Sequence, residues 1–415
     1  MSLLIKNVIL ENKKVDIFIS EGKIQKIASR INKKAKDKID GQGEKAIFPG
    51  LVNAHTHSAM NLFKGVGEGL SLKDWLEKKI WPLEKRLSAD DVYWGTKLAC
   101  LEMIKTGTTC FNDMYFFQEA AIKAIQEMGL RAVIGLTILD SSPWGKREDI
   151  VRFWQKWQKE KMERIKFSLA PHSIYTVSKE NLIWSKNFAQ KNNLLIHFHL
   201  AETKEEVDNS LKENKLRPVE YLKKIKFLGR NFIFAHGIWL SKKEIKILAD
   251  YHSYLVYNPI SNTKLAAGIF PYQNIQNAGI KICLGTDGAC SNNSLNMFKE
   301  MKAGLLLQKV SNLTPTIVST KEMFKIATEN GAQALGIKVG KIKEGYLADL
   351  FLINNNQLNS IPNHIKLYNL IFSYSIDLVT DLICHGQIIM REKKINNEKE
   401  IIFQSKKRTK KLLNN

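Results

Sequence analysis

The sequence is poor in cysteine and has no long apolar run. Its five cysteines, at positions 100, 110, 283, 290 and 384, show no CxxC spacing of a zinc finger or redox centre. An odd number of cysteines without a secretion signal predicts free thiols in a reducing compartment. No apolar run reaches the roughly 18 residues of a membrane span. The opening MSLLIKNVIL predicts a strand rather than a signal peptide, so we expect a cytoplasmic protein without a membrane partner.

Acidic residues are scarce relative to basic ones. The chain has 63 Lys and Arg against 41 Asp and Glu, a formal net charge of +22. Such an excess is compatible with nucleic-acid binding. The lysines are spread along the chain, however, and the paired H-x-E and P-C-x-x-C motifs of nucleic-acid deaminases are missing. We therefore expect no nucleic-acid partner, and we expect the basic tail at 396–415 to be a solvated, fraying terminus.

Apolar segments of strand length alternate with amphipathic segments along most of the chain. They lie at residues 50–57, 109–114, 131–139, 165–172, 194–199, 232–237, 254–258 and 281–287. Eight strands with intervening helices predict an α/β fold, a TIM-like (β/α)8 barrel. Alternation of apolar and polar residues also predicts short, half-buried strands near both chain ends. These lie at 3–9, 14–20, 23–28, 345–354 and 380–390.

Polar side chains follow several of the apolar segments where a strand would end. His55 and His57 are two residues apart, so on a strand they point to one face and can bind one metal ion. Later segments end in His197, His199 and Glu202, in His236 and in Asp287. Packing does not explain a polar residue at the same end of each core strand, because buried polar groups need partners. Since active sites of the barrel fold lie at the carboxyl ends of the strands, the pattern predicts a metal site there.

Together these segments resemble the amidohydrolase superfamily, and within it the methylthioadenosine/S-adenosylhomocysteine deaminase family. The resemblance covers about residues 1–390. Its segments are PGLVNAHTHSAM (49–60), WPLEKRL (81–87), APHSIYT (170–176), HLAET (199–203), AHG (235–237), LGTDGACSNNSLNMFKEM (284–301), ATENGAQALG (327–336) and GYLADLFLIN (345–354). It implies a metal-dependent hydrolase barrel over residues 49–339, beside a small β-sandwich built from residues 1–48 and 340–395.

The resemblance implies a metal site built from His55, His57, His199 and Asp287, with zinc as the expected metal. His197, two residues deeper on the same strand, is expected to support the site or to lie in the core. Binuclear relatives carry a bridging lysine at the end of the fourth strand. Here the nearest one, Lys166, lies at the strand's start, so we expect one divalent ion per subunit.

The catalytic residues that the resemblance implies are Glu202, His236 and Asp287. A bound metal ion lowers the pKa of its water to ~7. Glu202 would carry a proton to N1 of an adenine ring, and Asp287 would accept a proton from the attacking water. Both would therefore contact the substrate as well. His236 would orient the water and stabilise developing charge.

The expected substrate is a 5′-substituted adenosine: 5′-methylthioadenosine or S-adenosylhomocysteine, with 5′-deoxyadenosine and adenosine as further candidates. Deamination by the metal-activated water would yield the inosine analogue and ammonia. Glu84 matches the family glutamate that binds the ribose 2′- and 3′-hydroxyls, and a carboxylate suits two vicinal hydroxyls. His172 matches a substrate-contacting histidine. Arg147 is the candidate partner for the carboxylate of S-adenosylhomocysteine, although Leu136 stands where a second arginine would help.

The side chains around the 5′ group are a further expectation. Trp75, Met60, Leu62 and Phe63 would form an apolar wall for a methylthio group. Two other functions stay open. One is another mononuclear amidohydrolase, such as a guanine or other aminoheterocycle deaminase or a chlorohydrolase. The other is a basic nucleic-acid-binding protein with a degenerate site, which would bind DNA or RNA in a salt-dependent way. Related enzymes also lead us to expect a homo-oligomer.

Overall fold

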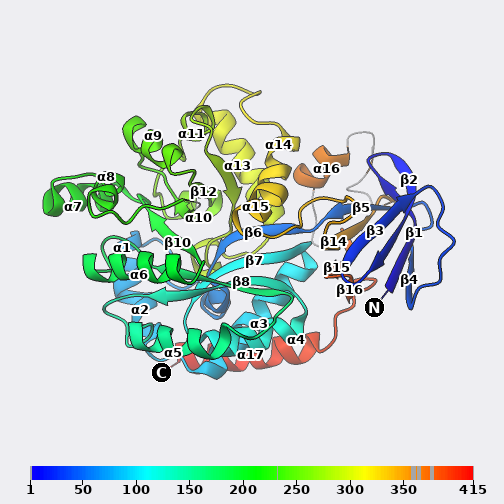
Figure 1. The fold of residues 1–415 in the computed structure, drawn as a ribbon, viewed down its shortest axis with the longest axis horizontal. Coiled ribbons are helices and arrows are strands. Elements are labelled where there is room, and N and C mark those ends of the chain that lie inside the picture. The colour runs from blue at the N-terminus through cyan, green and yellow to red at the C-terminus, as the bar shows by residue number, and fades with distance from the viewer. Residues whose placement is uncertain (1, 231, 357–360, 362–365, 374–377, 415) are drawn as a thin grey trace.

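The structure is a computed structural model, and it describes residues 2–230, 232–356, 361, 366–373 and 378–414. Eight parallel strands form its centre, with helices around them (Figure 1). The strands are β6 (Leu51–Thr56), β7 (Thr108–Tyr115), β8 (Arg131–Ile138), β9 (Ile165–Pro171), β10 (Leu195–Leu200), β11 (Ile233–His236), β12 (Tyr254–Tyr257) and β13 (Lys281–Leu284). They pair in sequence order, as a (β/α)8 barrel requires, so the predicted fold is confirmed.

The α-helices of the described chain lie around the barrel (Figure 1). They are α1 (Leu72–Trp75), α2 (Trp81–Glu84), α3 (Ala89–Lys105), α4 (Gln118–Met128), α5 (Arg147–Trp157), α6 (Lys179–Lys191), α7 (Lys204–Asn214), α8 (Pro218–Lys224), α9 (Lys242–Asp250), α10 (Pro259–Lys264), α11 (Tyr272–Asn277), α12 (Ala289–Asn292), α13 (Met297–Ser311), α14 (Thr320–Lys325), α15 (Gly331–Ala334), α16 (Lys366–Phe372) and α17 (Glu398–Leu413). Among the described residues, none of these helices has the length and apolar character to cross a membrane.

The first and last barrel strands, β6 and β13, approach each other at their carboxyl ends. The backbone N–H of Asp287 donates to the carbonyl of His55 over 3.0 Å. The side chain of Asn53 accepts from the backbone N–H of Thr286 at 3.0 Å and donates to its hydroxyl at 2.7 Å. Gly285 permits this approach, because a Cβ there would lie 3.0 Å from the Cβ of His55. These hydrogen bonds hold the carboxyl ends of β6 and β13 together, so the side chains at the two ends keep their positions relative to each other.

Both chain ends join one mixed sheet beside the barrel, drawn in dark blue and orange-red in Figure 1. Its order is β16-β15-β14-β5-β1-β2-β3, and β4 pairs with β1. The strands are β1 (Ser2–Leu10), β2 (Lys13–Ser20), β3 (Lys23–Ala28), β4 (Asp37–Asp40), β5 (Lys45–Pro49), β14 (Leu350–Asn354), β15 (Val379–Cys384) and β16 (Gln387–Met390). The sequence pattern predicts all of these except the short β4 and β5. The exact division of the chain at residues 48 and 339 stays a prediction.

The alternation of side chains along β14 explains how the sheet joins the barrel. Leu350 and Leu352 pack into the small core of the mixed sheet. Phe351 and Ile353 point the other way and belong to the large core of the barrel. Successive strand residues face opposite sides of a sheet, so one short strand contributes to both cores.

A buried ion pair also connects the two parts. The guanidinium of Arg131, at the start of β8, donates to both carboxylate oxygens of Asp349 over 2.9 and 3.1 Å. Asp349 precedes β14, and its Oδ1 also accepts from the backbone N–H of His385 at 2.9 Å. Two-pronged arginine–carboxylate pairs are geometrically specific as well as strong.

The expectation of a fraying C-terminal tail is wrong. Residues 398–413 form α17, which packs against α3 along the lower side of the molecule in Figure 1. Ile401, Ser405 and Leu412 are buried on one face of this helix, and Arg408 forms an ion pair with Asp91 over 3.6 Å. The run of lysines dominates the composition of the segment and conceals this helical stripe of buried residues.

The Arg131–Asp349 pair should contribute strongly to stability. Replacing Asp349→Asn leaves the Arg131 guanidinium buried without its counter-charge, and we expect a loss of about 3 kcal/mol in the free energy of unfolding. Urea-induced unfolding followed by circular dichroism would measure this loss. The control is Lys204→Met, which removes an exposed pair with Asp208 and should leave the midpoint nearly unchanged. If Asp349→Asn and Lys204→Met unfolded at the same urea concentration, the buried Arg131–Asp349 pair would not have the stabilising role expected here.

Candidate active site

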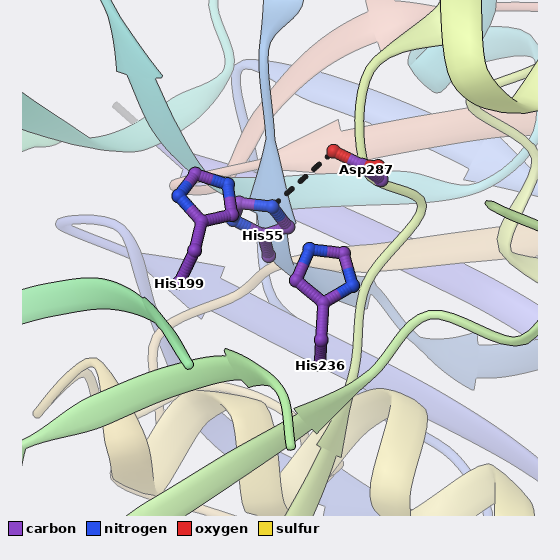
Figure 2. Close-up of side chains that lie close together, drawn as sticks. All are labelled: His55, His199, His236 and Asp287. Atoms are coloured by element: carbon purple, nitrogen blue, oxygen red, sulfur yellow. Dashed lines mark ion pairs between the residues drawn. The ribbon is translucent and has the colours of Figure 1, made fainter. Parts of the chain in front are cut away.

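Five potential metal ligands meet at the carboxyl ends of the barrel strands. Ligand atoms of His55, His199, His236 and Asp287 lie within 4.8 Å of one another, and Figure 2 shows these side chains converging on one point. His57 adjoins the same group: its Nε2 lies 3.2 Å from Oδ1 of Asp287 and 3.3 Å from Nε2 of His199. The structure therefore brings together all four residues of the implied metal site, with His236 beside them.

The separations suit a common metal ion. Nε2 of His55 lies 3.3 Å from Oδ1 of Asp287. This is close to the separations of 3.2 and 3.3 Å between Nε2 of His57 and its neighbours Asp287 and His199. Ligand atoms bound ~2.1 Å from a tetrahedral ion lie roughly 3.4 Å apart. Three imidazoles and a carboxylate are also a donor set that divalent zinc and related metals accept.

Hydrogen bonds orient the rings of this cluster. In each ring the Nδ1 atom has a partner, which leaves Nε2 directed at the centre. The partners are the Met114 carbonyl for His57 at 2.6 Å, the His172 carbonyl for His199 at 3.0 Å, the Asn262 side-chain oxygen for His236 at 2.9 Å, and Nε2 of His197 for His55 at 2.9 Å. Such outer contacts are typical of metal-binding histidines. His197 thus supports the ring of His55. Support of the site was one of the two roles expected for His197 from the sequence; the other was a place in the core.

Two serines hold the carboxylate of Asp287. Ser261 and Ser291 donate to its Oδ2 over 2.6 and 2.8 Å, while Oδ1 faces His55 and His57. Burial favours the neutral acid, but the two histidines outweigh it and hold the pKa of Asp287 well below its usual range. One oxygen is therefore free to bind a cation while the other is fixed by neutral donors. Serines are too common in proteins for the sequence alone to reveal this role.

Glu202 lies just beyond β10, next to the cluster. Its Oε2 is 3.6 Å from Nε2 of His236, and its side chain is buried. Burial raises the pKa of Glu202 above that of an ordinary glutamate. A raised pKa favours the protonated form of a carboxyl group, the form that acts as a general acid.

A single cavity joins the cluster to the predicted substrate residues. Glu84 and His172 both line it, together with His57, His199, Glu202, His236 and Asp287. Burial raises the pKa of Glu84 to about 7 and lowers the pKa of His172 to about 3. His172 is therefore a neutral ring, and its Nδ1 lies within hydrogen-bond distance, 2.9 Å, of the Thr176 hydroxyl.

The rest of this cavity is mainly apolar. Its lining includes Met60, Leu72, Trp75, Leu76, Trp81, Met114, Phe116 and Leu139. Two members of the predicted apolar wall, Met60 and Trp75, are among them. The other two, Leu62 and Phe63, are packed in the hydrophobic core instead. Tyr115 also lines the cavity, a residue for which the sequence predicted no role.

Arg147 does not lie where its predicted role requires. It begins α5 outside the cavity, where its guanidinium donates to the side-chain oxygen of Asn181 and lies 5.6 Å from the ring of Trp184. The segment between β8 and α5 carries Arg147 over to α6, away from the metal-ligand cluster. Arg147 is not among the described residues that line the cavity, so the structure gives no support to a substrate-binding role for it.

The chain is similar to known proteins over nearly its whole length. The profile of the Amidohydrolase family matches residues 46–389. The chain belongs to the amidohydrolase family. A 5′-deoxyadenosine deaminase of Methanosphaera stadtmanae is 41% identical to this amidohydrolase over 98% of the chain and 97% of the relative. A 5-methylthioadenosine/S-adenosylhomocysteine deaminase of Thermococcus sibiricus is 42% identical, over 94% of each chain.

A solved structure shares the whole architecture of this amidohydrolase. It is an adenosine deaminase from Xanthomonas campestris with bound zinc, and it is 29% identical. The TM-score is 0.93, and the match covers 100% of this chain and 98% of the other. The resemblance recognised in the sequence is thus confirmed at the level of the family.

The metal assignment can be tested by metal content. We expect His199→Ala to lose most of its bound metal, because it removes a ligand whose Nε2 faces the cluster. His172→Ala should retain stoichiometric metal, since it removes a cavity residue outside the cluster. Inductively coupled plasma mass spectrometry of both purified variants would measure this. If His199→Ala kept its full metal content at wild-type thermal stability, His199 would not be a metal ligand.

Proposed function

We propose that this amidohydrolase deaminates 5′-substituted adenosines by hydrolysis, giving the inosine analogue and ammonia. One observation carries the proposal: a single buried cavity holds a carboxylate suited to a ribose diol, Glu84, together with Glu202 and the histidine–aspartate cluster. The names of the curated relatives, 5′-deoxyadenosine deaminase and 5-methylthioadenosine/S-adenosylhomocysteine deaminase, support the same reaction and substrate class.

We propose that His55, His57, His199 and Asp287 hold one divalent ion, with zinc as the favoured metal. The bound ion would supply Lewis-acid activation of the attacking water. The zinc in the Xanthomonas campestris relative supports this choice. Lys166, the nearest lysine on β9, donates to the carbonyl of Gly336 over 2.6 Å and does not line the cavity, which favours one ion over a lysine-bridged pair.

The chain's own residues then divide the proton transfers. The oxygen of water adds to C6 of the adenine ring while Asp287 accepts the proton that water releases. Glu202, whose pKa is raised by burial above that of an ordinary glutamate, donates a proton to ring N1. His236, with Nδ1 directed at Asn262, uses its other ring nitrogen to orient the water. The proton held by Asp287 passes to the 6-amino group, which departs as ammonia when the C6–N bond breaks. The proton left on the C6 oxygen returns to Glu202, which gives the 6-keto ring of the inosine analogue.

The composition of the cavity favours small, uncharged 5′ groups. Among the described residues that line it there is no lysine or arginine, and apart from the metal-ligand cluster, Glu84, His172 and Glu202 most of the lining side chains are apolar. An amino-acid carboxylate buried there would lack a cationic partner, which is costly. We therefore propose that 5′-deoxyadenosine and 5′-methylthioadenosine are better substrates than S-adenosylhomocysteine. A cytoplasmic location and a homo-oligomeric state stay predictions.

Ammonia release from a panel of substrates tests the function. We expect turnover of 5′-deoxyadenosine, 5′-methylthioadenosine and adenosine, weaker turnover of S-adenosylhomocysteine, and none of free adenine or guanine. Glu202→Gln should lower kcat by about 10²- to 10⁴-fold because it removes the proton donor. Arg147→Ala is the control and should leave kcat/KM unchanged for every substrate. Turnover of free guanine in place of nucleosides would favour the base-deaminase alternative.

The ribose contact should depend on pH. Burial raises the pKa of Glu84 to about 7, so this side chain becomes a neutral acid below that pH and loses part of its capacity to accept hydrogen bonds. We expect KM for 5′-methylthioadenosine to rise as the pH falls from 8 to 6. In Glu84→Gln, KM should be high and independent of pH across this range. A wild-type KM that stays constant with pH would contradict a ribose contact by Glu84.

A further inference from the structure

The chain turns sharply between β10 and the proton donor Glu202. Ala201, at this turn, has φ +47°, a left-handed conformation that is unfavourable for residues with a Cβ. Its carbonyl accepts from the backbone N–H groups of Ile238 and Trp239 over 3.0 and 2.9 Å. The loop after β11 therefore holds one side of the turn.

Glu206 holds the other side. Its Oε1 accepts from the backbone N–H of Ala201 at 2.8 Å, and its Oε2 accepts from the backbone N–H of Glu202 at 2.9 Å. The Glu206 side chain is only 5% exposed. Both oxygens are thus engaged with the two residues that set the direction of the Glu202 side chain.

An ordinary role in the helix does not account for Glu206. It lies in the first turn of α7, but the hydroxyl of Thr203 already caps this helix, accepting from the backbone N–H of Glu206 at 3.1 Å. Burial and the neighbouring acidic side chains of Glu202 and Glu244 raise the pKa of Glu206 to about 8, while the N–H groups of Ala201 and Glu202 act in the opposite direction. Burying a carboxyl group is costly, and its two hydrogen bonds to the turn compensate for part of that cost.

We propose that Glu206 is a positioning residue for the deamination: its side-chain carboxyl group holds the left-handed turn at Ala201 and so places Glu202 for proton transfer to the substrate. The inference rests on the proposed function, in which Glu202 carries the proton. It adds to that function a buried residue, Glu206, which does not line the cavity but holds the backbone of the proton donor Glu202.

Glu206→Gln tests the idea with little change in size. The amide keeps one acceptor but turns an NH2 group toward the second backbone N–H. We expect kcat for 5′-methylthioadenosine to fall about 10- to 100-fold through misplacement of Glu202. KM should change less than about twofold, because Glu84 and His172 are untouched, and bound metal should stay at the wild-type level. Glu206→Asp, one methylene shorter, should show the same split between kcat and KM.

The matched control is Asp16→Asn. Asp16 is 2% exposed and accepts from two backbone N–H groups, those of Asn7 and Ile31, both at 2.9 Å, but it lies in the mixed sheet. We expect Asp16→Asn and Glu206→Gln both to lower thermal stability, but only Glu206→Gln to lower kcat.

Three outcomes would overturn the proposal: wild-type kcat in both Glu206 variants, a rise in KM or loss of metal that accounts for the lost activity, or an equal fall of kcat in the control. A wild-type enzyme without activity on any nucleoside would instead refute the proposed function itself.

Discussion

The contact between β6 and β13 is the constraint on which the site depends. The two strands stand at opposite ends of the barrel's sequence, yet the N–H of Asp287 bonds to the carbonyl of His55. Without this contact the last ligand would not face the first two, and the carboxylate would lack its histidine partners. Glycine at 285 is the local sequence feature that lets the strands come so close.

The backbone of the site adopts unfavourable left-handed conformations at three residues. His236 and Asp287 have φ values of +70° and +60°, and Ala201 lies in the same left-handed region. Such conformations cost free energy and persist only where the surroundings impose them. Here the surroundings are polar: Asn262 holds the ring of His236, two serines hold Asp287, and Glu206 holds the turn at Ala201. The site is thus a set of strained turns, each stabilised by buried hydrogen bonds.

Much of the architecture could be predicted because its signals are local. Each barrel strand is an apolar run bounded by polar residues, and His55 and His57 share a strand face through the two-residue period. The C-terminal helix could not be recognised, because its buried face consists of Ile401, Ser405 and Leu412 within a lysine-rich segment. The contact of Arg147 with Asn181 outside the cavity could not be predicted for a related reason: the path of the loop before α5 leaves no local signal in the sequence.

The sequence by itself determined the family, through the resemblance of its motifs. It also determined the barrel and the metal-ligand candidates, because the apolar pattern of a strand and the residue types at its end can be recognised in neighbouring residues. Only the tertiary structure decided what each ligand contacts and which charges reach the cavity. It places Ser261 next to Asp287, Glu206 next to Ala201, and Arg147 next to Trp184 outside the cavity. Such relations join residues on different elements, so they depend on how strands and loops pack, and packing distances are not encoded in local pattern.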